Sequence, residues 1–467
     1  MATVTELCSK TLTEVAELIK KKEVSPVELT QAMLDRISAL DGKLYSYLTV
    51  TADPALQQAR AAEQEIGKGT YRGPLHGIPI AVKDLCYTKG IRTTCASKIL
   101  ANWVPDHNAT VVEKLNAAGA VLLGKLGMTE FALAGYHPSI HPPVNPWSAD
   151  CWPGASSSGS GVATAASLCF GSLGSDTGGS IRFPSASCGI VGVKPTYGKV
   201  SRYGVFPLGE SLDHIGPMTR SVADAAVILR AIAGFDPKDP TTRRGTVRDY
   251  LDTVFNGVKG IRIGVDETYC RTGVDPQISK AVLATTSVFK DLGASIHEVK
   301  ISGIDDDPFW NTICAAETAA AHEQWYPSRA DDYGPTFRAF LAEGVKVSGI
   351  DYAKAQVKRQ ALRRMLDDLL QKVDLLLCPS MSILPMPLKD FPPDVILSPE
   401  ASAGLLRHTA PFDLTGSPTI SVPCGFSAEG LPLSLQLIGR HDEEGLVMQA
   451  GHAYEQATDW HKRRPPV

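Results

Sequence analysis

Apolar strand-like segments and amphipathic helix-like segments alternate along most of this chain, and this alternation restricts the fold more than any other feature. In the first half, 78–83 (IPIAVK) predicts a strand, 110–119 a helix that ends at a glycine, and 120–125 a second strand. Further segments are expected as strands (260–266, 294–301, 374–379, 418–425, 431–439) or as helices (161–169, 275–293, 352–373, 443–460). This order predicts an α/β fold in which helices cover both faces of a central mixed β-sheet.

Two helices are expected ahead of the first strand. Apolar residues recur at helical spacing from Leu12 to Ile19. The second helix should start at Ser25, which fits an N-cap, with a proline at the first helical position and Glu28 at the third, as in a capping box. We expect one domain, 1–467, whose N-terminal helical segment of about 70 residues packs on the core.

Charge and composition exclude several classes of partner. The 467 residues carry a net charge of −4, so no basic field is available for nucleic acid. The N-terminus has no apolar signal segment, and no apolar run is long enough to span a membrane. The 10 cysteines include no C-x-x-C pair, which indicates reduced core residues. We therefore expect a cytoplasmic protein with no nucleic-acid or membrane partner; the oligomeric state stays open, with a homodimer as one option.

Common cofactor and metal motifs fail. The P-loop, the G-x-G-x-x-G fingerprint and the G-x-S-x-G elbow do not occur around the glycine-rich turns. An S-x-x-K at Ser287 and Lys290 falls inside a predicted helix without its partner motif and is interpreted as chance. His137 and His141 have the spacing of two helical metal ligands, but the prolines around them predict a loop. We expect neither a cofactor nor a metal.

Two glycine- and serine-rich blocks lie close together, at 153–161 (PGASSSGSG) and 174–184 (GSDTGGSIRFP). Glycines next to Ser180 leave the main chain bare, so successive N–H groups can converge on one anion, such as the oxyanion of a tetrahedral intermediate. This predicted nest consists of Thr177, Gly178, Gly179 and Ser180. Asp176 and Arg182 flank the turn, and their expected role is an ion pair that braces it.

A serine nucleophile needs a base, and the sequence offers Lys83. No histidine stands near either block, whereas Lys83 ends the apolar strand IPIAVK. Burial would lower the pKa of this amine toward neutrality and make it a proton acceptor. The serines of 153–161 are candidates to relay a proton between Lys83 and Ser180.

Several longer blocks resemble the amidase signature family. The block 174–184 is complete for that family, 188–198 (CGIVGVKPTYG) follows it, and 77–84 (GIPIAVKD) matches the family's lysine strand. Further matches occur at 211–226 (SLDHIGPMTRSVADAA) and 416–425 (GSPTISVPCG), so the resemblance extends from about residue 10 to 463. It implies the amidase signature fold and an amidase that acts on a small-molecule amide.

The resemblance also implies a Ser–cisSer–Lys triad and an acyl-enzyme. By position in the motifs, Ser180 is the nucleophile, Ser156 the relay and Lys83 the base. The family holds its relay serine through a cis peptide bond to the preceding residue. That residue is Ala155 here instead of glycine, and Ser158 is a second departure from the family's G-G-S-S-G-G-S.

Two positions bear on which branch of the family this chain resembles. One branch consists of the glutaminase chains of glutamyl-tRNA amidotransferases, which work in a complex and hold their substrate with an arginine and an aspartate. Arg359 matches the first, but Leu406 stands at the place of the second. This favours a free-standing amidase; the glutaminase chain of an amidotransferase is the alternative, and a non-catalytic scaffold on the same fold is a third hypothesis.

The substrate pocket is expected at two stretches. The segment 133–147 is where the family places part of its pocket wall, and it offers Gly135, Tyr136 and Trp147. A second wall is expected within 310–340, which contains Trp310, Trp325 and Tyr326. Their apolar character favours a neutral aryl or alkyl amide, or a carbamate.

Overall fold

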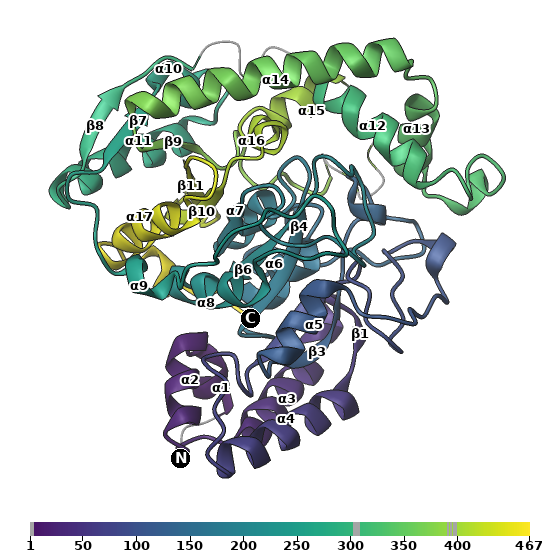
Figure 1. Cartoon of the computed structure of the whole chain (residues 1–467), viewed down its shortest axis with the longest axis vertical. Helices are drawn as coiled ribbons and strands as arrows, with labels where there is room; N and C mark the ends of the chain where they lie inside the picture. Colours follow the sequence, from purple (N-terminus) through teal and green to yellow (C-terminus); the bar gives the residue numbers. More distant parts are fainter. Residues whose placement is uncertain (1–3, 302–308, 390–391, 393–394, 396–398) are drawn as a thin grey trace.

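A mixed β-sheet forms the centre of the protein, as predicted (Figure 1). The computed structural model describes all residues except 1–3, 302–308, 390–391, 393–394 and 396–398. Within the described residues, 11 strands form one sheet in the order β1-β3-β2-β4-β6-β5-β10-β11-β9-β7-β8. These strands are β1 (Tyr47–Val50), β2 (Pro79–Lys83), β3 (Val121–Leu126), β4 (Gly171–Asp176), β5 (Val191–Lys194), β6 (His214–Thr219), β7 (Arg262–Val265), β8 (Ser295–Glu298), β9 (Leu375–Pro379), β10 (Thr419–Phe426) and β11 (Pro432–Ile438).

Helices flank the sheet, and the described ones fall into an N-terminal, a middle and a C-terminal group. The first group is α1 (Val4–Ser9), α2 (Leu12–Lys20), α3 (Pro26–Leu44), α4 (Ala52–Gly67) and α5 (Thr110–Ala117). The middle group is α6 (Ser158–Ala165), α7 (Arg182–Cys188), α8 (Val222–Ile232), α9 (Leu251–Val254), α10 (Glu267–Arg271) and α11 (Pro276–Asp291). The last group is α12 (Phe309–Ala321), α13 (Pro335–Gly344), α14 (Gly349–Lys372), α15 (Pro399–Leu406), α16 (Ala410–Thr415) and α17 (Glu444–Gln456).

Strand direction brings two parts of the sequence to one edge. Strand β2 runs parallel to β4, with Val82 opposite Leu173. The carboxyl ends of parallel strands lie at the same edge of a sheet, and ligands of α/β proteins bind outside that edge. Lys83 ends β2 and Asp176 ends β4, so the lysine strand and the glycine-rich turn after β4 meet there.

The N-terminal helices begin as the sequence predicts. Ser25 caps α3 by accepting hydrogen bonds from the backbone N–H groups of Val27 and Glu28. A reciprocal capping box closes the start of α2, between Thr11 and Glu14. In Figure 1, α1 to α4 lie together at the end of the molecule that carries the N-terminus.

The helix predicted at 161–169 is shifted toward the N-terminus. It begins at Ser158 and ends at Ala165, because Ser167 adopts a left-handed conformation (φ 58°) that breaks the helix before β4. The serine-rich block therefore runs directly into the first turn of α6. The long loop expected at 379–399 is described only in part, since 390–391, 393–394 and 396–398 lie outside the described residues.

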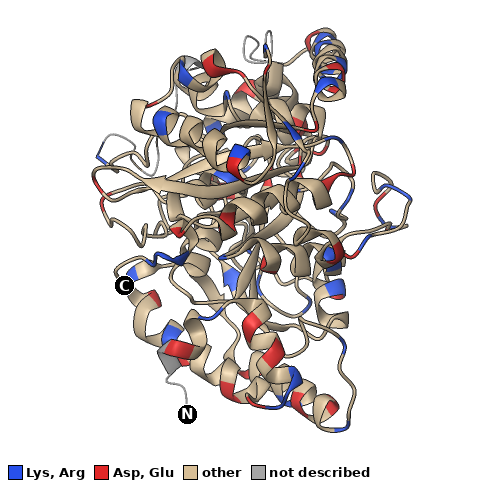
Figure 2. Cartoon of the chain, turned by 90° about the vertical axis from the view of Figure 1, so that its left-hand side faces the viewer, with Lys and Arg blue, Asp and Glu red and all other residues tan. Residues whose placement is uncertain are grey.

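The remaining sequence expectations concern thiols, charge and membranes. All 10 cysteines are free, and all except Cys151 are buried, as predicted. Figure 2 shows basic and acidic residues interspersed along the chain, in keeping with 46 Lys and Arg against 50 Asp and Glu. Among the described residues, no helix combines the length and apolar character needed to cross a membrane.

Candidate active site

The side chain of Lys83 lies fully buried among three serine hydroxyls. Its Nζ donates to Ser156 Oγ at 2.6 Å, to Ser157 Oγ at 2.9 Å and to Ser175 Oγ at 2.8 Å. Both glycine- and serine-rich blocks contribute to this arrangement, since Ser156 and Ser157 precede α6 and Ser175 lies near the end of β4. The lysine is thus connected by hydrogen bonds to both blocks.

Burial lowers the pKa of Lys83 to about 7, because the charged ammonium loses its hydration. The negative charges of Asp176 and Asp213 act in the opposite direction and favour the ammonium. At neutral pH a large fraction of Lys83 is therefore an uncharged amine. Such an amine can accept a proton from a hydroxyl that lies within hydrogen-bond distance.

The two serine blocks also contact each other directly. The backbone N–H of Ser157 donates to the carbonyl of Ser180 at 3.3 Å. The hydroxyl of Ser157 accepts from Ser175 N–H and donates to the Ser175 carbonyl, each at 3.2 Å. The peptide bond between Ala155 and Ser156 is cis, as the family resemblance implies. These contacts fix the position of Ser156 relative to the turn that carries Ser180.

One member of the predicted oxyanion nest points elsewhere. The backbone N–H of Gly179 donates to Asp176 Oδ1 at 2.5 Å, and the N–H of Ile181 donates to Asp176 Oδ2 at 3.0 Å. The carboxylate attracts the Gly179 N–H because it closes a short turn back onto β4. The N–H groups of Thr177, Gly178 and Ser180 remain as the candidate donors to an oxyanion.

A buried ion-pair network braces this turn. Arg182 binds Asp176, as predicted, with Nη2 at 2.9 Å from Oδ1. The same Nη2 lies 2.6 Å from Asp413 Oδ2, while Nη1 donates to the Thr409 carbonyl and to Gln436 Oε1. All of these charged groups are fully buried, so each depends on the others for compensation.

Apolar side chains surround the bare backbone of Gly178. Trp310 Nε1 donates to the Thr177 carbonyl at 2.8 Å, and the Thr409 hydroxyl donates to the Gly178 carbonyl at 2.6 Å. A Cβ placed on Gly178 would lie 2.7 Å from Trp310 Cζ2 and 3.0 Å from Leu406 Cδ2. Only glycine fits here without displacing Trp310, and the space beside the nest is therefore apolar.

A separate apolar cluster lies on the same side of the catalytic segment. Its buried members are Trp152, Ala155, Phe183, Ala186, Met381 and Leu405. Partly buried residues pack against it, namely Ile383, Met386, Leu388, Val395 and Leu406. The cluster includes the residue that precedes Ser156 and contacts Leu406. The surroundings of the site are thus apolar on more than one side.

The predicted pocket-wall residues occupy different places. Tyr136 is buried, and its hydroxyl donates to Ser158 Oγ at 2.8 Å, at the start of α6. Gly135 adopts φ 85°, and a Cβ there would lie 2.6 Å from Thr336 Oγ1. Trp147 is directed to β10, since its Nε1 donates to the Cys188 carbonyl and its ring packs on Phe426 at 4.9 Å.

Arg359 is already bound to protein groups. Its Nε donates to the Leu414 carbonyl at 2.7 Å, and Nη1 and Nη2 donate to the hydroxyl and the carbonyl of Ser211 at 2.7 and 2.6 Å. A substrate carboxylate at this arginine would compete with these acceptors. Leu406, at the place of the family's aspartate, carries no charge.

The residues set aside in the sequence occur as expected. Ser287 and Lys290 lie within α11, and His137 and His141 lie in a loop. Among the residues that the structure describes, no group of three or more His, Cys, Asp or Glu side chains could hold a metal ion.

Sequence reasoning missed several residues of this site. Ser175 and Ser157 both contact Lys83, and their only sequence signal is their position inside the two blocks. Asp413 and Gln436 follow Arg182 by more than 230 residues, and no local pattern connects them.

Comparison with known proteins gives consistent matches along the chain. Residues 28–448 match the family model described as Amidase. The chain is 45% identical over 458 residues to a protein of Mycobacterium tuberculosis named "Putative amidase AmiD", covering 98% of this chain and 96% of that protein. It is 40% identical to the first (A) component of the glutamyl-tRNA(Gln) amidotransferase of Moorella thermoacetica, covering 99% of both. Among solved structures, a bacterial aryl acylamidase of the amidase signature family is 26% identical, with a TM-score of 0.88 and coverage of 97% of this chain and 98% of that one.

Proposed function

The chain belongs to the amidase family, whose members are amidohydrolases, and on that premise we propose that it hydrolyses a carboxylic amide through Lys83, Ser156 and Ser180. One observation carries the proposal: Lys83 Nζ lies buried at 2.6 Å from Ser156 Oγ, on the segment that bonds to the Ser180 backbone. In this proposal Ser180 is the nucleophile, Ser156 relays the proton, and Lys83 is the base.

Acylation follows from these roles. Neutral Lys83 takes the proton of Ser156, and Ser156 takes the proton of Ser180 as the Ser180 oxygen attacks the amide carbonyl. The resulting oxyanion accepts hydrogen bonds from the N–H groups of Thr177, Gly178 and Ser180. The C–N bond then breaks while the proton returns from Lys83 through Ser156 to the leaving nitrogen, which departs as ammonia or an amine.

Deacylation repeats the same transfers with water in place of Ser180. A water molecule attacks the acyl carbon as its proton passes to Lys83 through Ser156. The bond to Ser180 Oγ breaks, the proton returns to that oxygen, and the carboxylic acid leaves. Both half-reactions begin and end with neutral Lys83, which agrees with a pKa that burial lowers to about 7.

For the substrate we propose a neutral aryl or alkyl amide, or a carbamate. Trp310 and Leu406 line the space beside Gly178, and the apolar cluster around Trp152 and Phe183 extends it. An apolar group bound there gains about 25 cal/mol for each Å² removed from water. A charged substrate would lose hydration without a compensating partner.

The second candidate is the glutaminase chain of an amidotransferase, which the relative from Moorella thermoacetica keeps open. Identity of 40% against 45% does not separate the two branches. The side chains do favour one of them, because Leu406 cannot neutralise an ammonium group and Arg359 is engaged by Ser211 and Leu414. We therefore propose a free-standing amidase of the cytoplasm, which suits its free thiols.

A two-part experiment tests the proposal. A fluorophosphonate probe should label the wild type and not S180A, and a screen of anilides, aliphatic amides, carbamates and glutamine should show hydrolysis only by the wild type. The matched control is S287A, since Ser287 also has a lysine three residues later but is exposed on α11. Folded S180A that hydrolyses the same amide at more than a few per cent of the wild-type rate would exclude Ser180 as nucleophile.

A further inference from the structure

Asp213 is a buried carboxylate that touches the oxyanion turn without belonging to the proposed triad. It lies directly before β6, and its Oδ1 accepts a hydrogen bond from Thr177 Oγ1 at 2.6 Å. Its other acceptor contacts are with backbone N–H groups, from Leu208 to Oδ2 at 2.9 Å and from Gly209 to Oδ1 at 3.2 Å. One side chain thus joins the 208–213 loop to the first residue of the nest.

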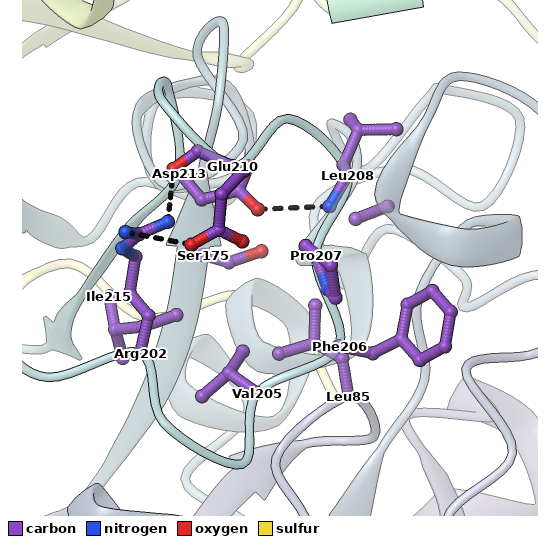
Figure 3. A pocket seen from close by; sticks show the side chains of 11 residues that line it. Leu85, Ser175, Arg202, Val205, Phe206, Pro207, Leu208, Glu210, Asp213 and Ile215 are labelled. Carbon is purple, nitrogen blue, oxygen red and sulfur yellow. Dashed lines mark hydrogen bonds and ion pairs between the residues drawn. The ribbon is translucent and has the colours of Figure 1, made fainter. Parts of the chain in front are cut away.

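A small pocket connects Asp213 with the surroundings of Lys83 (Figure 3). Asp213 and Ser175 both line this pocket, together with Arg202 and Glu210. Ser175 is the residue whose Oγ accepts from Lys83 Nζ at 2.8 Å. The pocket gives the centre of a water molecule about 10 Å³, so it has room for roughly one. Polar and charged groups therefore extend from Lys83 to Asp213 on the side away from Ser156.

The charges that face Asp213 are few. Arg202 is the nearest cation, and its guanidinium also pairs with Glu210 and donates to the Tyr197 hydroxyl. From α12 the thiol of Cys314 faces the same carboxylate. Burial raises the pKa of Asp213 to about 6, so the group is mainly ionised at and above neutral pH. Its charge then favours the ammonium form of Lys83.

We propose that Asp213 is a positioning residue for amide hydrolysis: its carboxylate orients Thr177 in the oxyanion nest and stabilises the protonated Lys83 that forms when Ser180 attacks. Nucleophilic attack turns a neutral lysine and a neutral amide into an ammonium and an oxyanion. A fixed carboxylate that contacts the nest and lies near the ammonium favours this charge separation before the reaction begins. The inference rests on the proposed function, since it takes Lys83 as the base.

The test is the pH dependence of kcat/KM in D213N, which removes the charge at nearly constant shape. The plateau should fall by about tenfold or more, and the acid limb should move to lower pH by about 0.5 to 1 unit, because Lys83 loses a nearby negative charge. D224N is the matched control: Asp224 is equally buried and accepts from two backbone N–H groups and one threonine hydroxyl, but those belong to Leu12 and Thr13. Its acid limb should stay in place.

A second pair of variants separates orientation from charge. T177V removes the hydroxyl that Asp213 accepts, whereas T177S keeps it. T177V should lower the plateau without moving the acid limb, and T177S should retain most of the activity. Equal activity of T177V and T177S would overturn the orienting role, and this comparison stands even if D213N is recovered only unfolded.

The outcomes distinguish the two proposals. An acid limb that stays in place in folded D213N, while S180A is inactive, overturns the role of Asp213 and leaves the triad intact. A shift of the same size in D224N would also overturn it. Activity in folded S180A overturns the proposed function itself, whatever D213N shows.

Discussion

Trp310 donates the hydrogen of its indole nitrogen to the carbonyl of Thr177 at 2.8 Å, and so ties α12 to the turn that carries Ser180. The two residues are 133 positions apart in the chain. A hydrogen bond of this kind contributes about 1 kcal/mol, which corresponds to roughly a fivefold effect on a rate constant if it acts in the transition state.

W310F should therefore lower kcat for an anilide by about fivefold, because the ring remains and the hydrogen bond is lost. Steady-state kinetics measures it, with W325F as control, since Trp325 stacks on Phe206 away from the Thr177 carbonyl. An unchanged kcat in W310F would show that the indole only fills space.

The rate should rise through neutral pH to an alkaline plateau. Lys83 acts as a base only when uncharged, and burial places its pKa at about 7, so kcat/KM should rise between about pH 6 and 8. A pH series with a neutral anilide tests this. A profile that falls across the same range would exclude a neutral lysine as the base.

Gly178→Ala should abolish most activity while the protein stays folded. The new Cβ would lie 2.7 Å from Trp310, so either the indole or the turn must move. Gly349→Ala is the control, because Gly349 lies at the start of α14 with no atom within 4 Å of an added Cβ. We expect a loss of at least about 100-fold in kcat for Gly178→Ala, since each 1.36 kcal/mol of lost transition-state stabilisation is tenfold. Equal rates for both variants would contradict the described geometry.

Replacing Arg182 should destabilise the protein strongly. Arg182→Met leaves Asp176 and Asp413 as uncompensated buried carboxylates, a loss of about 3–5 kcal/mol. Urea unfolding measures the change. The control is Arg364→Met, whose exposed pair with Asp368 is worth about 0.5 kcal/mol or less. Similar losses for both would mean that the buried network adds nothing beyond a surface pair.

A neutral anilide should exceed glutamine in kcat/KM by at least about 100-fold. Glutamine brings an ammonium group that Leu406 cannot neutralise, and desolvation of that group costs at least a few kcal/mol. The L406D variant should narrow the gap. Glutamine hydrolysed as fast as the anilide would favour the amidotransferase candidate.

The sequence predicted the parts of this protein whose signals are local. The apolar strand that ends in Lys83, the two glycine- and serine-rich blocks and the Asp176–Arg182 pair are confirmed. Strands β4 (GSLGSD) and β6 (HIGPMT) went unpredicted, because glycine and serine residues replace the usual apolar alternation. These small residues let α6 and α8 pack closely on the sheet.

Other parts of the site depend on long-range contacts. The nest was expected to include Gly179, but the direction of one N–H depends on where the Asp176 carboxylate lies. Trp147 was expected near the substrate because it follows the right segment, yet its indole bonds to the end of α7. Sequence spacing gives the neighbourhood of such groups, whereas packing determines their direction.

The brace of the nucleophile turn also bears on how the chain matures. Lys83, Ser156 and Ser180 all belong to the first 180 residues, but Arg182 is held by Thr409, Asp413 and Gln436. A chain emerging from the ribosome therefore holds every residue of the proposed triad long before it holds the partners that order the turn. Reactivity toward amides should appear only when synthesis is nearly complete, which protects unfinished chains and their neighbours from a premature serine nucleophile.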